Sequence, residues 1–279
     1  MIILAMRYGN HSNRLFQNLH FEAFCKENDI EYINPTFYTM RKFYCEPCKT
    51  LKGYKGILPL ISSFTNNFIL RVIKKLQLMN ITSFDSELNN NENLLIPPPQ
   101  HIQMRDMFVS GWYFRVPDLL KKHQDYFIKK YALKSEYYAN NEMYKKFVAL
   151  KNEGIFIIGV HIRRGDYKYW GNGRYYFDDN TYLKYMQNLK SEVKNIYNKE
   201  SLFIIFSNEK IVIKEAPDII LSKNKWYIDQ FIMSQCDLLI GPPSTFTSWA
   251  SYMGNVKRFW IENDSGEISI DKFTVAVSQ

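Results

Sequence analysis

Apolar and polar residues alternate in long blocks through the second half of the chain. Apolar runs of strand length occur at residues 155–162, 202–207, 218–221, 237–240 and 258–261. Apolar residues at helical spacing occur between them, at residues 181–195, 226–235 and 245–253. Continuous apolar runs indicate strands that are buried on both faces, which is typical of parallel sheets. We therefore expect a parallel sheet whose strands are joined by right-handed helical crossovers.

The first half of the chain opens with a similar pattern. We expect a strand at residues 2–6, a helix that ends near Lys26 and a second strand at residues 31–34. A further strand is expected at residues 107–113, and residues 117–150 are expected to be largely helical. An opening of strand, helix and strand is typical of one half of a nucleotide-binding fold.

The predicted fold class is α/β, with two Rossmann-like domains that face each other across a cleft. The boundary is expected near residue 150, where polar residues and Gly154 interrupt the pattern. The N-terminal domain then comprises residues 1–150 and the C-terminal domain residues 151–279. Because open α/β sheets bind ligands at the carboxyl ends of their strands, the residues that follow each strand are the candidates for a binding site.

Residues 35–100 have a less regular pattern. A short apolar run at residues 94–96 predicts a strand before three prolines. Residues 68–79 are a candidate basic amphipathic helix, which could lie on an anionic membrane, although an ordinary surface helix is the commoner explanation. Cys45 and Cys48 form a CxxC pair without a second pair or a nearby histidine, so we expect a plain loop there rather than a zinc site.

Composition and charge narrow the functional classes. Of the 279 residues, 46% are hydrophobic and 16% aromatic, which excludes global disorder. Lysine and arginine (36) exceed aspartate and glutamate (28) by +8, which favours anionic partners. This charge is spread along the chain rather than clustered, so nucleic-acid binding is not expected. No window approaches the roughly 18 apolar residues of a membrane span, and the first residues lack the basic start of a signal peptide, so we expect a cytoplasmic protein.

The most informative motif follows the apolar run at residues 155–162. His161–Tyr167 has the sequence HIRRGDY. Two adjacent arginines at the exit of a buried strand are costly to hold unless an anion meets them. Since side chains alternate along a strand, we expect Arg163 to face a ligand and Arg164 to brace the loop. A surface ion pair between Arg164 and Asp166 explains the local sequence equally well.

Three further polar segments follow expected strands. Residues 241–251 combine a turn of small residues with a helix start rich in hydroxyl groups, which suits an anion, although simple capping explains one of these hydroxyls. Ser207–Glu209 end a strand and either bind a ribose or base or cap the strand end. Residues 8–18 form a polar loop without a GxGxxG fingerprint. The chain has no Asp-x-Asp triplet of the kind that holds Mg²⁺ or Mn²⁺ in metal-dependent sugar transfer, and Asp178–Asp179 is expected to cap a helix.

Together these segments resemble a known family. HIRRGDY matches the H-x-R-R-x-D motif of fucosyltransferases at every fixed position, and the whole pattern resembles the glycosyltransferase family 11 α-1,2-fucosyltransferases. Asn13–Gln17 is similar to the family's N-terminal G-N-Q-L-F-Q, with Ser12 where Gly is usual and Arg14 where Gln is usual. Phe206–Glu209 resembles the middle motif, and residues 229–249 resemble the D…LMSxC…SSFSWWGA segment.

The resemblance implies a GT-B architecture and an inverting, metal-independent transfer of fucose to a glycan hydroxyl, in α-1,2 linkage on a surface polysaccharide or a related glycan. GDP-fucose would be the donor substrate and would be held mainly by the C-terminal domain, with the N-terminal domain on the acceptor side. No cofactor would be needed, and Arg163 would meet the β-phosphate. Asp166 and His11 are the candidates for the general base. The implied donor-binding residues are Asn13, Arg14, His161, Arg163, Arg164, Ser207, Asn208, Glu209, Ser244, Thr245, Phe246 and Thr247.

Several alternatives stay open at this point. The chain could use another GDP-sugar or a peptide acceptor. It could also be a non-enzymatic module that binds anions or glycans, with Arg164–Asp166 as an integrin-type tripeptide, although that tripeptide follows a buried strand. A peripheral contact with the inner face of a membrane is the alternative that residues 68–79 leave open.

Overall fold

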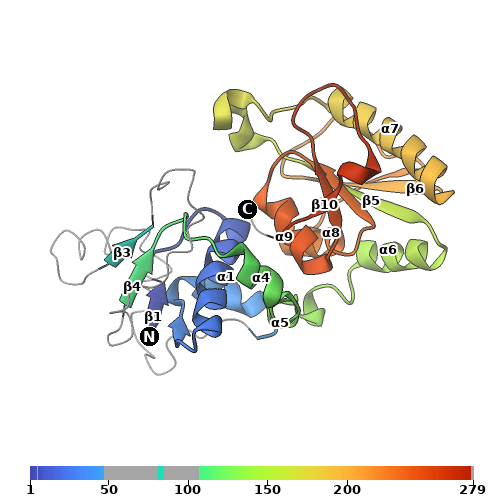
Figure 1. Ribbon diagram of the computed structural model, residues 1–279. Helices are drawn as coiled ribbons and strands as arrows, with labels where there is room; N and C mark the ends of the chain where they lie inside the picture. Colours follow the sequence, from blue (N-terminus) through green and yellow to red (C-terminus); the bar gives the residue numbers. More distant parts are fainter. Residues whose placement is uncertain (5, 47–80, 85–106, 278–279) are drawn as a thin grey trace. The chain divides into compact units, whose positions relative to one another are not determined.

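The chain folds into two compact α/β units (Figure 1). The computed structural model describes residues 1–4, 6–46, 81–84 and 107–277. Unit 1 is Met1–Ala132 and unit 2 is Leu133–Val277. This division precedes α6 (Glu142–Asn152), whereas the sequence pattern places the boundary near residue 150. Phe147 of α6 is buried in a core cluster of unit 2, so this helix belongs with the second unit.

Unit 1 contains a four-stranded parallel sheet in the order β2-β1-β4-β3. Its elements are β1 (Ile2–Leu4), α1 (His11–Glu27), β2 (Tyr32–Ile33), η1 (Pro35–Phe43), β3 (Ile81–Ser83), β4 (Met107–Ser110), α4 (Pro117–Lys122) and α5 (Gln124–Lys130). The first strand is shorter than the sequence pattern predicts, and the helical stretch expected at residues 117–150 is divided into several helices. The elements expected at residues 68–79 and 94–96 lie outside the described residues, as does Cys48.

Helix α1 holds the carboxyl edge of this sheet together. The Gln17 side chain donates hydrogen bonds to the carbonyl oxygens of Met6 (3.1 Å) and Gly111 (2.9 Å). It thereby joins the loop after β1 to the loop after β4. Asn18 is fully buried and accepts a hydrogen bond from the Tyr32 hydroxyl at 3.0 Å. Because these polar groups are paired, the helix can be buried along nearly its whole length.

Unit 2 contains a six-stranded sheet in the order β10-β9-β8-β5-β6-β7. Its strands are β5 (Phe156–Ile162), β6 (Ser201–Ser207), β7 (Ile219–Leu221), β8 (Leu238–Gly241), β9 (Lys257–Trp260) and β10 (Thr274–Val275). Its helices are η3 (Ser135–Tyr137), α6, η4 (Gly165–Lys168), η5 (Trp170–Gly173), α7 (Asp179–Tyr197), α8 (Trp226–Met233), α9 (Thr245–Gly254) and η6 (Ile270–Lys272). The first five strands are parallel, as the apolar pattern predicts, and only the short edge strand β10, which the pattern does not reveal, is antiparallel.

Helices cover both faces of this sheet, which explains the continuous apolar runs in its sequence (Figure 1). On one face, Ile158 and Val160 of β5 share a core cluster with Tyr182 and Tyr185 of α7. On the other face, Ile157 packs in a second cluster with residues of α6, α8 and α9. Within the described ranges, every helix is too short or too polar to cross a membrane.

The strand order places a switch point between β5 and β8. The chain continues from β5 to β6 and β7 on one side, and then returns to β8 and β9 on the other. In open α/β sheets, ligands bind outside the carboxyl ends of the strands at such a point. The two strand ends approach closely, because a Cβ added at Gly241 would lie 2.6 Å from the His161 carbonyl oxygen. Arg163 and the start of α9 therefore emerge at the same edge of the sheet.

Candidate functional site

Arg163 follows the last residue of β5 and is available to an anion. Its guanidinium forms an ion pair with Asp166, with Nη2 at 2.8 Å from Oδ1 and 3.0 Å from Oδ2. The Asp166 side chain is 59% exposed, so solvent screens this pair and it stabilises the fold little. Among the described residues, the buried Nε atoms of Arg163 and Arg164 both lack a hydrogen-bond partner, so the exposure of its partner is what distinguishes Arg163. The guanidinium can therefore exchange its weak partner for a stronger anion.

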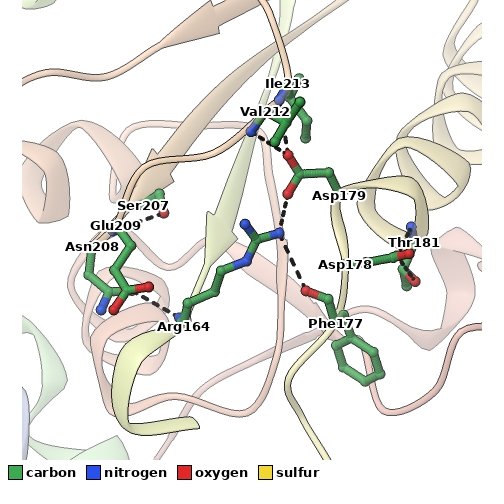
Figure 2. Close-up of polar contacts among 10 residues, drawn as sticks. All are labelled: Arg164, Phe177, Asp178, Asp179, Thr181, Ser207, Asn208, Glu209, Val212 and Ile213. Atoms are coloured by element: carbon green, nitrogen blue, oxygen red, sulfur yellow. Dashed lines mark hydrogen bonds and ion pairs between the residues drawn. The ribbon is translucent and has the colours of Figure 1, made fainter. Parts of the chain in front are cut away.

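Arg164 is anchored in the fold instead (Figure 2). Its side chain is only 12% exposed and forms an ion pair with Asp179, which is 14% exposed. The second carboxylate oxygen of Asp179 accepts hydrogen bonds from the backbone N–H groups of Val212 (2.6 Å) and Ile213 (3.0 Å). One carboxylate thus ties together the end of β5, the start of α7 and the loop after β6. This agrees with the bracing role that side-chain alternation predicts for Arg164. The alternative prediction, an ion pair between Arg164 and Asp166, is wrong, because Asp166 pairs with Arg163.

The polar residues at the end of β6 support the turn that carries the two arginines. The Asn208 side-chain oxygen accepts a hydrogen bond from the Arg164 backbone N–H at 3.0 Å, as Figure 2 shows. The Glu209 backbone N–H donates to the Ser207 hydroxyl at 3.2 Å. Gly165 has a φ of +65°, and a Cβ there would lie 2.9 Å from Glu209 Oε1. These hydrogen bonds are of the kind that the capping alternative predicts for Ser207–Glu209. Binding of a nucleoside by the same residues stays a prediction.

His161 is a buried, neutral link between β5 and α9. Its Nδ1 lies 2.8 Å from the Thr247 hydroxyl, and its ring packs against Phe246 with the ring centres 5.1 Å apart. Burial, together with the nearby charge of Arg163, lowers the pKa of His161 to about 3. An uncharged imidazole adds no positive charge to an anion site. The contacts of His161 instead position the first turn of α9.

We expect His161 to remain neutral in the folded protein down to about pH 4, because its pKa is lowered to about 3. The unfolded chain, with an ordinary histidine pKa of about 6.5, binds this proton first as the pH falls. The group therefore reduces the free energy of unfolding as the pH drops from about 6.5 toward 3. NMR titration of the imidazole resonances, assigned with a His161→Gln variant, measures this pKa. A titration midpoint near 6.5 would contradict the buried, uncharged state.

The start of α9 lies at the switch point and carries no acidic residue in its first turn. Ser244 caps the helix, since its hydroxyl accepts a hydrogen bond from the Phe246 backbone N–H at 3.3 Å. Tyr167 donates its hydroxyl to the Pro243 carbonyl oxygen, and its ring lies 5.5 Å from the Arg163 guanidinium carbon. The positive end of a helix and a guanidinium are thus joined through one tyrosine. This arrangement suits an anion such as a diphosphate.

The hydroxyls of the α9 segment are not equivalent. Thr247, Ser248 and Ser251 are fully buried, and Ser244 is nearly so. Thr247 bonds His161, and the Ser251 hydroxyl donates to the Val256 carbonyl oxygen at 2.6 Å. Packing accounts for these two hydroxyls. The predicted contact of Ser244–Thr247 with donor phosphates is therefore best tested at Ser244 and Thr245, which begin the helix.

The candidate residues of unit 1 lie at the carboxyl end of β1. Arg14 is buried, and its guanidinium bonds the Thr36 carbonyl oxygen and lies 3.4 Å from the Thr39 hydroxyl of η1. Burial lowers the pKa of Arg14 to about 10, and burial together with Arg14 also lowers the pKa of His11. The Asn13 side chain packs against Gly9, since a Cβ added at Gly9 would lie 2.3 Å from Asn13 Nδ2. Donor binding by Asn13 and Arg14 stays a prediction.

Two residues matter more than the sequence pattern indicates. Asp179 is the partner of Arg164, and its place beside the helix-capping Asp178 was the only sequence signal for it. Asp229, in the first turn of α8, is buried and accepts a hydrogen bond from the Ser222 hydroxyl. Burial raises the pKa of Asp229 to about 7, so its charge changes near neutral pH.

In the described part of the chain, no group of three His, Cys, Asp or Glu residues is placed to hold a metal ion.

Comparison with known proteins finds solved structures of similar fold but no match by sequence. No family model and no curated protein matches the chain. The NodZ α-1,6-fucosyltransferase soaked with GDP-fucose matches with a TM-score of 0.52 and 14% identity over 92% of this chain and 94% of NodZ. A mutant of Arabidopsis thaliana FUT1 in complex with GDP matches with a TM-score of 0.54 and 12% identity over 100% of this chain and 74% of FUT1. POFUT1 in complex with GDP-fucose matches with a TM-score of 0.53 and 12% identity over 91% and 94% of the two chains.

These likenesses confirm that the predicted fold class is α/β of the GT-B type. The chain has the α/β architecture of GT-B fucosyltransferases, with a parallel sheet in unit 1 and a mainly parallel sheet in unit 2. At 12% to 14% identity, the comparison establishes the fold and leaves the reaction to be argued from the residues.

Proposed function

We propose that the protein transfers fucose from GDP-fucose to a hydroxyl group of a glycan acceptor. The observation that carries this proposal is the Arg163 guanidinium, which is weakly paired and lies at the switch point where α9 begins. Solved fucosyltransferases of this fold hold GDP or GDP-fucose. A fixed cation and the positive end of a helix are the features that a departing diphosphate requires.

The chemistry follows from where charge develops. The acceptor hydroxyl attacks C1 of fucose as the bond from C1 to the β-phosphate oxygen breaks, and the acceptor proton passes to a base. Negative charge grows on the β-phosphate, so Arg163 stabilises the transition state more than the bound substrate. Attack opposite the leaving group inverts the configuration at C1. Asp166 is exposed and His11 has a lowered pKa, so each can accept a proton, and both remain candidates for the base.

We propose a metal-independent reaction because the adjacent carboxylates Asp178 and Asp179 already accept hydrogen bonds or ion pairs from other groups of the protein. Asp178 accepts hydrogen bonds from the Thr181 backbone N–H (2.8 Å) and hydroxyl (2.7 Å). Asp179 holds Arg164 and two backbone N–H groups. Arg163 and the first turn of α9 then supply the positive charge. The finer proposals, an α-1,2 linkage, a surface glycan as acceptor and a cytoplasmic location, rest on the resemblance of the motifs alone.

Ligand-induced stabilisation tests the donor. We expect GDP and GDP-fucose to raise the melting temperature, with or without EDTA, because a ligand at 100 times its Kd stabilises a protein by about 2.7 kcal/mol. GDP-mannose and UDP-sugars are the matched comparisons in a thermal-shift assay. Stabilisation by UDP-sugars alone, or a shift that EDTA abolishes, would contradict the proposal. Equal stabilisation by GDP-mannose and GDP-fucose would support a donor with another sugar.

A further inference from the structure

An exposed aromatic segment follows the Arg163 turn directly. Within residues 167–176, the side chains of Tyr169, Trp170 and Tyr176 are 78%, 51% and 42% exposed. In Figure 1 this segment is the short helical stretch in yellow-green that projects from unit 2. Large aromatic surfaces are costly to leave in water, so several of them in one short segment indicate a contact surface.

The rings in this segment form a supported stack rather than separate projections. Tyr167 and Trp170 stack with ring centres 5.0 Å apart, and Trp170 and Tyr175 with ring centres 5.5 Å apart. Tyr167 is buried and bonded to the Pro243 carbonyl oxygen, while Tyr175 packs against the core on the α7 side of the sheet. Trp170 thus contacts two anchored rings and keeps half of its surface in solvent.

The turn after Trp170 fixes the return of the chain to Tyr175. Three successive residues, Gly171, Asn172 and Gly173, have left-handed φ values of 56°, 57° and 78°. Glycine and asparagine are the residues that adopt this conformation with least strain. The local sequence therefore specifies a tight turn that brings Tyr175 into contact with Trp170.

The stack is continuous with the anion site. The ring of Tyr167 lies 5.5 Å from the Arg163 guanidinium carbon, and Trp170 is the next ring outward. In the proposed reaction the acceptor sugar must lie beside the phosphate that Arg163 holds, because its hydroxyl attacks the carbon bonded to that phosphate. A sugar ring presents a face of C–H bonds, which is attracted to the negative face of an aromatic ring.

We propose that the stack of Tyr167, Trp170 and Tyr175 is the acceptor platform, on which a sugar ring of the glycan packs against Trp170. This inference rests on the proposed transfer reaction and adds the residues that receive its acceptor. Exposed aromatics flanked by cations such as Lys168 and Arg174 also occur at membrane surfaces. The glycan is favoured here because the rings are packed together beside Arg163.

Substitution of Trp170 tests the platform. Saturation-transfer NMR on the GDP-loaded protein would measure binding of lactose, N-acetyllactosamine and chitotetraose. We expect Trp170→Ala to weaken binding of the sugar that wild type binds by about tenfold, which corresponds to about 1.4 kcal/mol. Trp170→Phe should retain most of that binding, because it keeps an aromatic face. GDP affinity should be unchanged in both variants.

A matched control is Tyr197→Ala, which removes a ring that is 43% exposed at the far end of α7 and should bind sugar as wild type does. Sugar binding that is unchanged in Trp170→Ala, or no binding of any of the three sugars by GDP-loaded wild type, would overturn the platform while the donor proposal stands. Failure of wild type to bind GDP would instead overturn the donor proposal. Sedimentation with phosphatidylcholine–phosphatidylglycerol vesicles that depends on Trp170, without sugar binding, would assign the surface to a membrane.

Discussion

Replacing Arg163 with alanine is expected to lower turnover by about 10²-fold or more, the effect of removing one preorganised donor from a developing charge. The fold should tolerate the change, because among the described residues the ion pair lost is the exposed one with Asp166, worth at most about 1 kcal/mol. Initial rates of GDP release from GDP-fucose in the presence of a glycan acceptor measure the loss. Calorimetric titration with GDP would show a smaller loss in ground-state affinity, since charge on the phosphate grows during the reaction.

A matched variant separates charge from geometry at this position. Arg163→Lys keeps the positive charge but loses the planar fork that suits two phosphate oxygens, so we expect turnover between that of wild type and Arg163→Ala. Near-normal turnover in a folded Arg163→Ala protein would be incompatible with a role for this guanidinium at the leaving phosphate.

The Asp179→Ala variant is expected to lower the free energy of unfolding by about 3 kcal/mol, because removing one partner of a buried ion pair leaves the other charge uncompensated. Arg164 would lose its partner at 12% exposure, and the backbone N–H groups of Val212 and Ile213 would lose their acceptor. For a protein of this size, the change corresponds to a fall in melting temperature of about 6–12 °C. Thermal or urea unfolding of the purified variant measures it.

The control for this stability effect is the neighbouring exposed pair. Asp166→Ala removes a carboxylate that is 59% exposed, so we expect at most about 1 kcal/mol of destabilisation. Arg164 and Asp179 are in contact, so their effects on stability should not add. The Arg164→Ala/Asp179→Ala double variant should be less destabilised than the sum of the Arg164→Ala and Asp179→Ala single variants. Equal stability of Asp179→Ala and wild type would mean that the Arg164–Asp179 pair does not hold the three segments together.

The elements of unit 2 were largely predictable because its strands are buried on both faces. Each expected strand and helix of this unit is present, with ends displaced by a few residues. The antiparallel strand β10 was missed; it has only two residues and lies at the edge of the sheet. The division between the units differs from the expected one because Phe147 finds its core in unit 2, and a helical pattern does not show which core it joins.

The site was predictable to the extent that it is encoded by neighbouring residues. The two arginines at a strand exit and the hydroxyl-rich start of α9 are both visible as short motifs. The residues that contact these motifs from distant parts of the chain were not visible in the sequence. His161 is neutral because the core buries it beside Arg163, and its hydrogen-bond partner Thr247 lies 86 positions away.

The sequence by itself determined which residues leave the ends of strands, because strand length, alternation and capping depend on neighbours along the chain. It thereby singled out His161–Tyr167 and its two arginines. Only the tertiary structure decided their different positions: Arg164 pairs with Asp179, while Arg163 keeps an exposed partner and lies at the edge where α9 begins. The physical reason is that strand order and burial bring together groups that are distant in sequence, and burial determines whether an ion pair is permanent or open to exchange.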